Sequence, residues 1–364
     1  DGFATISIGR TDSTGDMNVD EITFNDPLIL RTNGTINIDG NLTGIETINF
    51  DGNTTLSADV LSSGNIITFE HNTIVDANVT VDSTNNGAFA AGANITFDGT
   101  IDATSDTNTE ALTINAGTAG LLTFNGDVGQ TEPLDNLGIS AGSVNFNGAI
   151  DVSGDLTLIL GLDSTLDTLT VGSIQITNTG TVTASQNVTS NGDIVFDGTG
   201  NLTLGGDFRT TNSGANISLP NSILLLTGDR LMSTTNGDIF LDEVQTDTAD
   251  DHVLTLLAGT GNITIDDNFG VDGTEPAGLT ITSATDVTFS TANATLETNG
   301  LIITNAAGQV RLDGTANIDG SVDINTATFD LNAAMNVDGN GTFTVTNSGT
   351  ADLGADITVD GNTL

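Results

Sequence analysis

The residues of this sequence that could do chemistry are mainly its carboxylates. The chain has 48 Asp and Glu but only five cationic residues, all of them arginine. Eight aspartates share one context, because each ends a short apolar stretch and precedes a glycine: Asp39, Asp51, Asp98, Asp197, Asp313, Asp319, Asp338 and Asp360. If such turns stacked along one edge, neighbouring charges about 5 Å apart would repel by a little under ~1 kcal/mol in water. Bound Ca²⁺ or Mg²⁺ would relieve that repulsion. Alternatively, these aspartates only keep the turns polar and prevent pairing between edges.

The two histidines carry no recognisable catalytic pattern. His71 lies in FEHNTIVD and His252 in TADDHVLTL, without a Ser or Cys partner motif. We expect both to be turn-exposed imidazoles. A polysaccharide lyase would need Arg, Lys, Tyr or His for proton abstraction, but the chain has neither Lys nor Tyr and its arginines are scattered.

Paired carboxylates are the pattern that leaves an enzyme open. Glycoside hydrolysis uses two carboxyl groups, and Asp250 with Asp251, or Asp266 with Asp267, could supply them. A chain this acidic contains adjacent acids by chance, so solvated turn residues are the favoured interpretation. The glycine-rich phosphate loop, HExxH and CxxC patterns are absent from the sequence.

The formal net charge of −43 limits the partners. Nucleic acids and anionic membrane surfaces require clustered Lys and Arg, so this field repels them. The sequence has no apolar run of 18 residues that would predict a membrane span. It has no Cys, which excludes a disulfide framework.

Asn-x-Thr/Ser triplets are a further recurring pattern. A glycan on them would require a host with the machinery, and we favour a role as residues of polar ladders. The triplets begin at Asn33, Asn41, Asn53, Asn78, Asn94, Asn187, Asn201, Asn216, Asn262, Asn293 and Asn340.

The elements that must position these residues are short strands that repeat. An apolar residue precedes an Asx-Gly turn, or its equivalent, at intervals that are mostly 19 to 31 residues. The series is Phe24, Phe50, Phe69, Phe97, Phe124, Phe146, Ile176, Phe196, Phe240, Ile265, Phe289, Leu312 and Phe343, with residues 217–226 filling the one double gap. A fixed period of this kind indicates a repeat architecture.

A second strand precedes the first within the repeat. It is marked by the pairs Leu112/Ile114, Leu137/Ile139, Leu169/Val171, Leu254/Leu256 and Leu279/Ile281. The tripeptide Thr-Glu-Pro precedes two of these pairs, at 131–133 and 274–276. Each unit is therefore two or three strands joined by turns rich in Gly, Asn and Asp.

The period favours an all-β parallel β-solenoid of about 15 coils of roughly 19–31 residues, running as one continuous element through 1–364. Asp-Gly is also a hairpin signal, so tandem antiparallel sandwiches stay open, although these repeat at roughly 90–100 residues. In the solenoid, Ile95 and Phe97 point inward while Asn94 and Thr96 point outward. Corner glycines, here Gly99, Gly198 and Gly314, would take positive φ, and Pro27, Pro133, Pro220 and Pro276 would occupy corners or bulges.

The segment LLTFNGDVGQTEPLDNLGISAGSVNFNGAIDVSGDLTL (121–158) resembles the repeats of large bacterial surface proteins of the filamentous-haemagglutinin and autotransporter-adhesin type. The resemblance is strongest over 91–176 and 237–314. It implies a right-handed parallel β-helix, exported to the cell surface, that acts as a stalk, fibre or adhesin shaft. The amino-terminal secretion domain of that family is not visible here.

From these observations we expect an extracellular, non-catalytic structural or adhesive protein that forms a rigid acidic rod. Both ends of the sequence have the pattern of ordinary strands, so the rod would continue into further sequence or copies would stack end to end. Its expected partners are further copies of itself, surface glycans or a host surface, with Ca²⁺ as an optional ion. The alternatives are a self-assembling sheath or surface-layer subunit and a carbohydrate-active β-helix enzyme.

Overall fold

The computed structural model describes residues 2–104, 109–271, 273–290, 294–339 and 341–360. Strands β1 to β37 lie in this part of the chain, which contains no helix. The chain is an all-β parallel β-solenoid of about 16 turns, which confirms the predicted fold class. Because neighbouring strands run parallel, the alternative of antiparallel sandwiches is wrong. The handedness implied by the resemblance stays a prediction.

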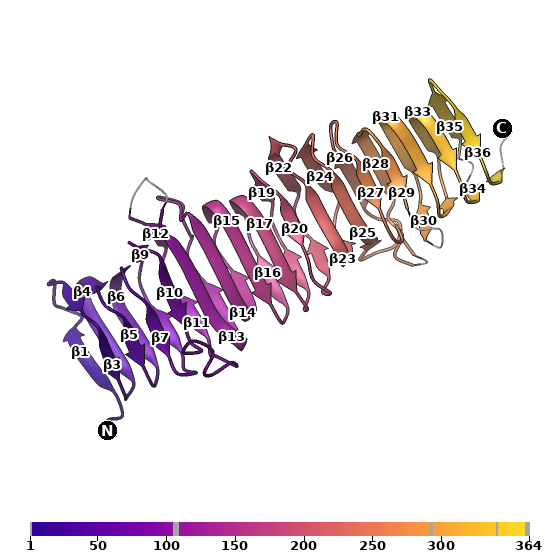
Figure 1. Cartoon of the computed structure of the whole chain (residues 1–364). Helices are drawn as coiled ribbons and strands as arrows, with labels where there is room; N and C mark the ends of the chain where they lie inside the picture. Colours follow the sequence, from indigo (N-terminus) through magenta and orange to yellow (C-terminus); the bar gives the residue numbers. More distant parts are fainter. Residues whose placement is uncertain (1, 105–108, 272, 291–293, 340, 361–364) are drawn as a thin grey trace. The chain divides into compact units, whose positions relative to one another are not determined.

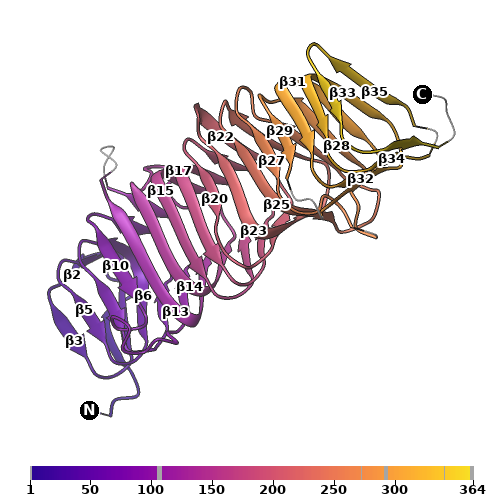
Figure 2. The ribbon, with the colours of Figure 1, turned by 45° about the vertical axis from the view of Figure 1, so that its right-hand side comes forward.

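The residues group into two units, Asp1–Val182 and Thr183–Leu364, and β18 (Val182–Ala184) contains the boundary. Within each unit the chain visits three faces in a fixed order, numbered 1, 2 and 3 here. Strands of one face, such as β13, β14, β15 and β17, lie side by side in Figures 1 and 2. Long strands bend at a corner and belong to two faces, and the ladder shifts register at those bends.

The strands of the first unit stack in register on all three faces. Face 1 contains β1 (Ile6–Arg10), the first parts of β4 (Leu28–Ile38) and β6 (Ile48–Leu56), β8 (Ile67–Phe69), β11 (Ile95–Phe97), the last parts of β13 (Ala111–Phe124) and β14 (Asn136–Phe146), and β16 (Ser164–Leu166). Face 2 contains β2 (Met17–Val19), the last parts of β4 and β6, β9 (Thr73–Val75), β12 (Ile101–Ala103), and the first parts of β15 (Ile150–Leu160) and β17 (Leu169–Asn178). Face 3 contains β3 (Ile22–Phe24), β5 (Leu42–Gly44), β7 (Val60–Ser62), β10 (Val79–Asp82), the first parts of β13 and β14, and the last parts of β15 and β17.

The second unit also has three faces, and these are numbered separately from the faces of the first unit. Face 1 contains β20 (Ile194–Phe196), the first parts of β23 (Ile217–Leu226) and β25 (Ile239–Thr246), β27 (Ile263–Ile265), β29 (Val287–Phe289), the last parts of β31 (Leu301–Leu312) and β33 (Val322–Leu331), and β36 (Ala351–Leu353). Face 2 contains β21 (Leu202–Leu204), the last parts of β23 and β25, β30 (Thr295–Thr298), β32 (Thr315–Ile318), β34 (Met335–Val337) and β37 (Ile357–Val359). Face 3 contains β19 (Val188–Ser190), β22 (Phe208–Ser213), β24 (Arg230–Thr235), β26 (Val253–Leu257), β28 (Gly278–Ser283), the first parts of β31 and β33, and β35 (Phe343–Asn347).

The interior is filled by ladders of identical or similar apolar side chains. On face 1 of the first unit, Phe50, Phe69, Phe97, Phe124 and Phe146 occupy one register position on five successive turns. The centroids of neighbouring rings are 4.6, 4.6, 5.5 and 5.0 Å apart, and the rings are stacked. Offset stacking is a favourable aromatic geometry, so the backbone spacing and the ring packing reinforce each other.

Alternation along the strand follows the expectation. Ile95 and Phe97 are buried, whereas Asn94 is exposed and Thr96 is half-buried. Pro27, Pro133 and Pro276 lie outside the strands. Pro220 lies inside β23, where the ladder shifts register between faces 1 and 2, as predicted for a residue that cannot donate to the ladder.

The prediction that the corner glycines take positive φ is wrong. Gly99, Gly198 and Gly314 are not among the glycines with positive φ. At Gly99 a Cβ would instead lie 2.5 Å from the backbone N of Asn72 in the preceding turn. Gly126 and Gly148 follow on the next two turns, and a Cβ at Gly148 would lie 2.6 Å from the carbonyl oxygen of Gly126. These corner glycines permit close approach of successive turns rather than a left-handed backbone.

Several register assignments are also wrong. In the second unit the position equivalent to the repeat's Phe is Leu241, which pairs with Leu219 and Ile265, so Phe240 points outward. Phe343 pairs with Val322 on face 3 rather than continuing the face 1 series. The pair Leu169/Val171 lies on face 2, and Ile176 aligns with Leu158 on face 3.

We predict that Phe97→Ala lowers the free energy of unfolding of the protein by about 3–5 kcal/mol, because it leaves a cavity inside the aromatic ladder. Phe89→Ala is the matched control, since Phe89 lies outside the strands and is 47% exposed. It should cost roughly 1 kcal/mol or less. Equal losses for the two variants in urea denaturation would contradict the ladder's role.

Candidate functional site: the polar corners

The corners between faces hold the polar residues, and their Asx side chains bond to the next turn. In the second unit one such ladder of Asx side chains runs along the corner between faces 3 and 1. The Oδ1 atoms of Asp193, Asn216, Asp238, Asn262 and Asp286 accept from the backbone N–H of Asn216, Asp238, Asn262, Asp286 and Gln309 at 2.8, 2.8, 2.7, 3.2 and 2.7 Å. Each Asx side chain thus satisfies a backbone donor where the chain enters a strand of the following turn.

This ladder alternates between Asp and Asn. Both side chains present the same acceptor oxygen, but only Asp carries charge. Placing Asn216 between Asp193 and Asp238, and Asn262 between Asp238 and Asp286, separates successive carboxylates by two turns, about 9.5 Å instead of ~4.8 Å. The alternation therefore keeps the hydrogen bonds while lowering like-charge repulsion.

The Asn-x-Thr/Ser triplets are explained largely by the same device. Six of their asparagines accept a backbone N–H from the next turn through Oδ1: Asn41, Asn78, Asn94, Asn187, Asn216 and Asn262. Asn33, Asn53 and Asn201 lie on the surface. Asn293 and Asn340 fall outside the described residues. The predicted role as ladder residues is confirmed for those six.

The eight Asp-Gly aspartates do not share one edge. In the first unit Asp51 and Asp98 follow the face 1 positions Phe50 and Phe97, whereas Asp39 follows Ile38 on face 2. In the second unit Asp197 and Asp313 follow strands of face 1, whereas Asp319, Asp338 and Asp360 follow strands of face 2. Asp98 accepts from Asn125 Nδ2 at 2.7 Å, so that position holds an amide rather than a second carboxylate on the next turn. In the second unit Asp319, Asp338 and Asp360 follow paired residues on three successive turns, and this is the series that matches the predicted stacking.

One predicted aspartate, Asp51, belongs to a cluster with metal-ligand atoms. Among the described residues, one ligand atom each from Asp51, Glu70 and His71 lies within 4.8 Å of the others. His71 Nε2 is 3.6 Å from Asp51 Oδ1, and Arg31 Nε is 3.4 Å from Asp51 Oδ2. Asn49 Nδ2 donates to Glu70 Oε1 at 2.8 Å.

This donor set differs from a Ca²⁺ site. Calcium takes six to eight oxygen ligands, whereas an imidazole favours a transition metal, and the guanidinium of Arg31 already offsets the charge of Asp51. Our prediction overlooked Glu70 because no glycine follows it. The signal was present, since Phe69 places Glu70 in the same repeat position as Asp51 and Asp98. His71 is 53% exposed, which confirms the expected exposure.

The pair Asp266 and Asp267 lies beside a second acidic pair from the preceding turn. Burial raises the pKa of Asp242, and the neighbouring Asp267, Asp266 and Glu243 raise it further, while a backbone N–H bond from Asn221 lowers it. A raised carboxyl pKa is what a general acid in glycoside hydrolysis needs. However, the hollow that reaches Asp267 has room for only about 10 Å³, enough for one water and not for a sugar.

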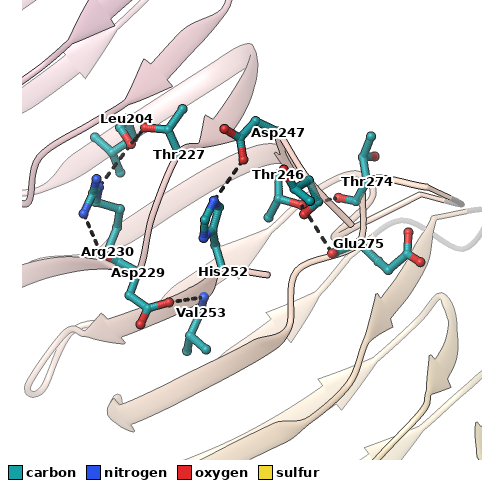
Figure 3. Close-up of polar contacts among 11 residues, drawn as sticks. Leu204, Thr227, Asp229, Arg230, Thr246, Asp247, His252, Val253, Thr274 and Glu275 are labelled. Carbon is teal, nitrogen blue, oxygen red and sulfur yellow. Dashed lines mark hydrogen bonds and ion pairs between the residues drawn. The ribbon is translucent and has the colours of Figure 1, made fainter. Parts of the chain in front are cut away.

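His252 differs from the expectation of a turn-exposed imidazole. Its side chain is only 15% exposed, and Nε2 lies 2.9 Å from Asp247 Oδ1. Figure 3 shows this pair beside the N–H of Val253, which donates to Asp229 at 2.9 Å. The imidazole therefore joins the two ends of the 247–252 excursion.

The second Thr-Glu-Pro tripeptide lies in the same region. The backbone N–H of Thr246 donates to the carbonyl oxygen of Thr274 at 3.0 Å. Its Oγ1 lies 3.2 and 3.3 Å from the carbonyl oxygens of Thr274 and Glu275 (Figure 3) and 2.7 Å from that of Thr248. In the first unit the corresponding tripeptide is held by Asp102, whose Oδ1 accepts from the N–H of Thr131 at 2.9 Å. These repeated tripeptides fix wide corners between faces 2 and 3.

Comparisons with known proteins give no assignment. No family model matches the chain, and no curated protein or solved structure matches it. Within the described ranges, no helix is long and apolar enough to cross a membrane.

We predict that Asn216→Asp destabilises the protein by about 1 kcal/mol at low ionic strength, because carboxylates then occupy three successive turns. High salt should remove most of this loss, because the Debye length is only about 3 Å at 1 M salt and the repulsion between carboxylates ~4.8 Å apart is then screened. Asn216→Ala is the control: it loses the Oδ1 acceptor of the bond to Asp238, so its loss should persist in salt. Denaturant unfolding at two salt concentrations measures both, and a salt-independent loss for Asn216→Asp would contradict charge spacing.

We predict that Asp242→Asn stabilises the protein at neutral pH. A folded-state pKa above the unfolded value means that ionisation costs folding free energy as pH rises through the raised pKa. The penalty is absent below the unfolded pKa, so wild type and variant should converge near pH 3. The gain at pH 7 should be about 0.5–1 kcal/mol, because water screens this partly exposed group.

Thermal unfolding across this pH range tests the prediction. Asp238→Asn, which keeps the acceptor for Asn262 and lies between amides in its ladder, should show little gain. A gain for Asp242→Asn that is constant with pH would contradict the electrostatic explanation.

Proposed function

We propose that this chain is part of an extracellular structural or adhesive protein, in which it forms a rigid, acidic, non-catalytic shaft of a surface fibre, stalk or adhesin. The observation that carries the proposal is the in-register stacking within each unit, where three parallel ladders and an apolar interior repeat turn after turn. Such repeats bury their apolar side chains against neighbouring turns and resist local bending. The sequence resemblance to filamentous-haemagglutinin-like and autotransporter-adhesin repeats supports the same role.

The acidic surface would be repelled by anionic membrane surfaces and would attract cationic partners or ions. With 48 acids against five arginines, self-repulsion keeps copies soluble and extended. Divalent cations, Ca²⁺ among them, would gather along the corners as loosely held counterions. The sheath or surface-layer subunit remains the second form of the same structural role.

The test of the function is the location and behaviour of the native protein. Antibodies raised against residues 1–364 should label intact cells of the source organism without permeabilisation, and negative-stain electron microscopy of the released material should show rods or filaments. Labelling only after permeabilisation would overturn the proposal. A regular lattice in place of separate rods would favour the surface-layer form.

We predict that Ca²⁺ raises the melting temperature of the protein more than NaCl at equal ionic strength, because a divalent ion offsets paired corner carboxylates better than Na⁺ does. The expected gain is a few degrees, corresponding to about 1 kcal/mol. Addition of a chelator should reverse it. Equal effects of the two salts would show that screening alone acts on these carboxylates.

A further inference from the structure

The outward surface of face 3 in the first unit contains a furrow along β14. Its floor is Gly138, and Asn136, the preceding outward-facing residue of this strand, also lines it. Thr113 of β13 and Thr157 of β15 pair with Gly138 from either side. Ile159, the next outward-facing residue of β15, pairs with Ser140 and lies beyond the hollow. The two threonines are therefore about 9.5 Å apart, with no side chain between them. The hollow has a volume of about 290 Å³.

Gly138 has no backbone reason to be glycine. Its φ lies outside the left-handed region, the ladder around it is regular, and an added Cβ would meet only Thr113 Oγ1, at 3.9 Å. Gly172, by contrast, would bring a Cβ within 2.5 Å of the backbone of the preceding turn. Glycine weakens a strand. Where neither a bulge nor a close backbone contact requires it, it marks a place where a ligand approaches.

The polar groups around the furrow limit the kind of ligand. The backbone of β14 pairs with strands on both sides, so a peptide cannot bind by strand addition. What remains are the hydroxyls of Thr113 and Thr157, the amide of Asn136 and, at one end, the carboxylate of Asp155. Asp155 accepts from Ser173 Oγ at 2.6 Å through Oδ1, which leaves Oδ2 to accept from a ligand.

We propose that this furrow binds a neutral saccharide. Hydroxyls of the sugar donate to Asp155 Oδ2 and bond to Thr113 and Thr157. The C–H face of the ring extends beyond the hollow over Ile159, which is 54% exposed. A small hollow with a few convergent polar groups and an exposed apolar side chain beside it is an arrangement that suits a small ligand. The net charge of −43 disfavours uronates and other anionic sugars.

The proposal rests on the adhesive part of the proposed function, for which it names a ligand class. The probes are the methyl glycosides of glucose, galactose, mannose and N-acetylglucosamine, with methyl glucuronide as the anionic comparison, titrated into the whole chain by NMR. At least one neutral glycoside should bind with a dissociation constant of about 1 mM, and the glucuronide should bind at least tenfold more weakly.

Gly138→Thr is the decisive variant, because it continues the threonine row and fills the furrow. It should weaken binding at least tenfold while the melting temperature stays equal or rises. Asp155→Asn keeps the shape and should also weaken binding. Thr123→Val on face 1 is the control and should leave binding unchanged.

Three results would overturn the proposal: no neutral glycoside binding to wild type, unchanged binding by Gly138→Thr, or a lower melting temperature for Gly138→Thr, since the last would give the glycine a structural role. A peptide or an anionic sugar binding in place of neutral glycosides would also overturn it. None of these results affects the surface labelling and electron microscopy that test the shaft, so the two proposals fail separately.

Discussion

Parallel backbone pairing in register is the constraint on which the rest of this structure depends. Each residue of a strand lies about 4.8 Å from its counterpart on the next turn, so every side chain is packed against its own equivalents. Inside, that repetition is favourable, because the phenyl rings of Phe50 and Phe69 stack at 4.6 Å and exclude water from each other. Outside, the same repetition would place like charges at the shortest possible spacing. Identical side chains on successive turns are therefore favourable in the interior, whereas identical charges on successive turns are unfavourable on the surface.

Asx residues solve the surface half of this problem. Asp and Asn present the same oxygen to the N–H of the next turn, so the ladder can hold either one without losing a bond. The choice between them then sets charge alone. The alternation through Asp193, Asn216 and Asp238 uses that freedom, and Asn125 offers its amide to Asp98 where a second Asp would repel it. The high content of Asn, Asp and Gly thus follows from corners that repeat, with Gly148 allowing the close approach of its neighbour's carbonyl.

The inward-facing residues could be predicted from the sequence where the repeat is regular. The predictions were wrong where the length of the turn changes. The Phe50 to Phe146 series could be placed because each member is a large apolar residue before a turn. Phe240 was misplaced because a one-residue slip moves a side chain to the other face, and the true inward residue, Leu241, follows it directly. The site residues were harder, since three corners have similar Asx-Gly sequences and only the fold separates Asp39 from Asp51. Pairing of Asp247 with His252 lies within an excursion of irregular length that no repeat describes.

Function in such a molecule has to be sought where a residue departs from what the ladder favours. Packing in the core limits which residues can face inward, and hydrogen bonding and close approach at the corners require Asx and Gly. Substitutions at these positions therefore change the stability of the fold first. Outward positions in mid-strand carry little of the fold, and threonine suits them because it is β-branched and polar. Glycine at 138, between Thr113 and Thr157, lowers strand propensity without easing any contact. A shaft selected only for rigidity would place a β-branched residue there, so the retained gap indicates that something other than the chain occupies it.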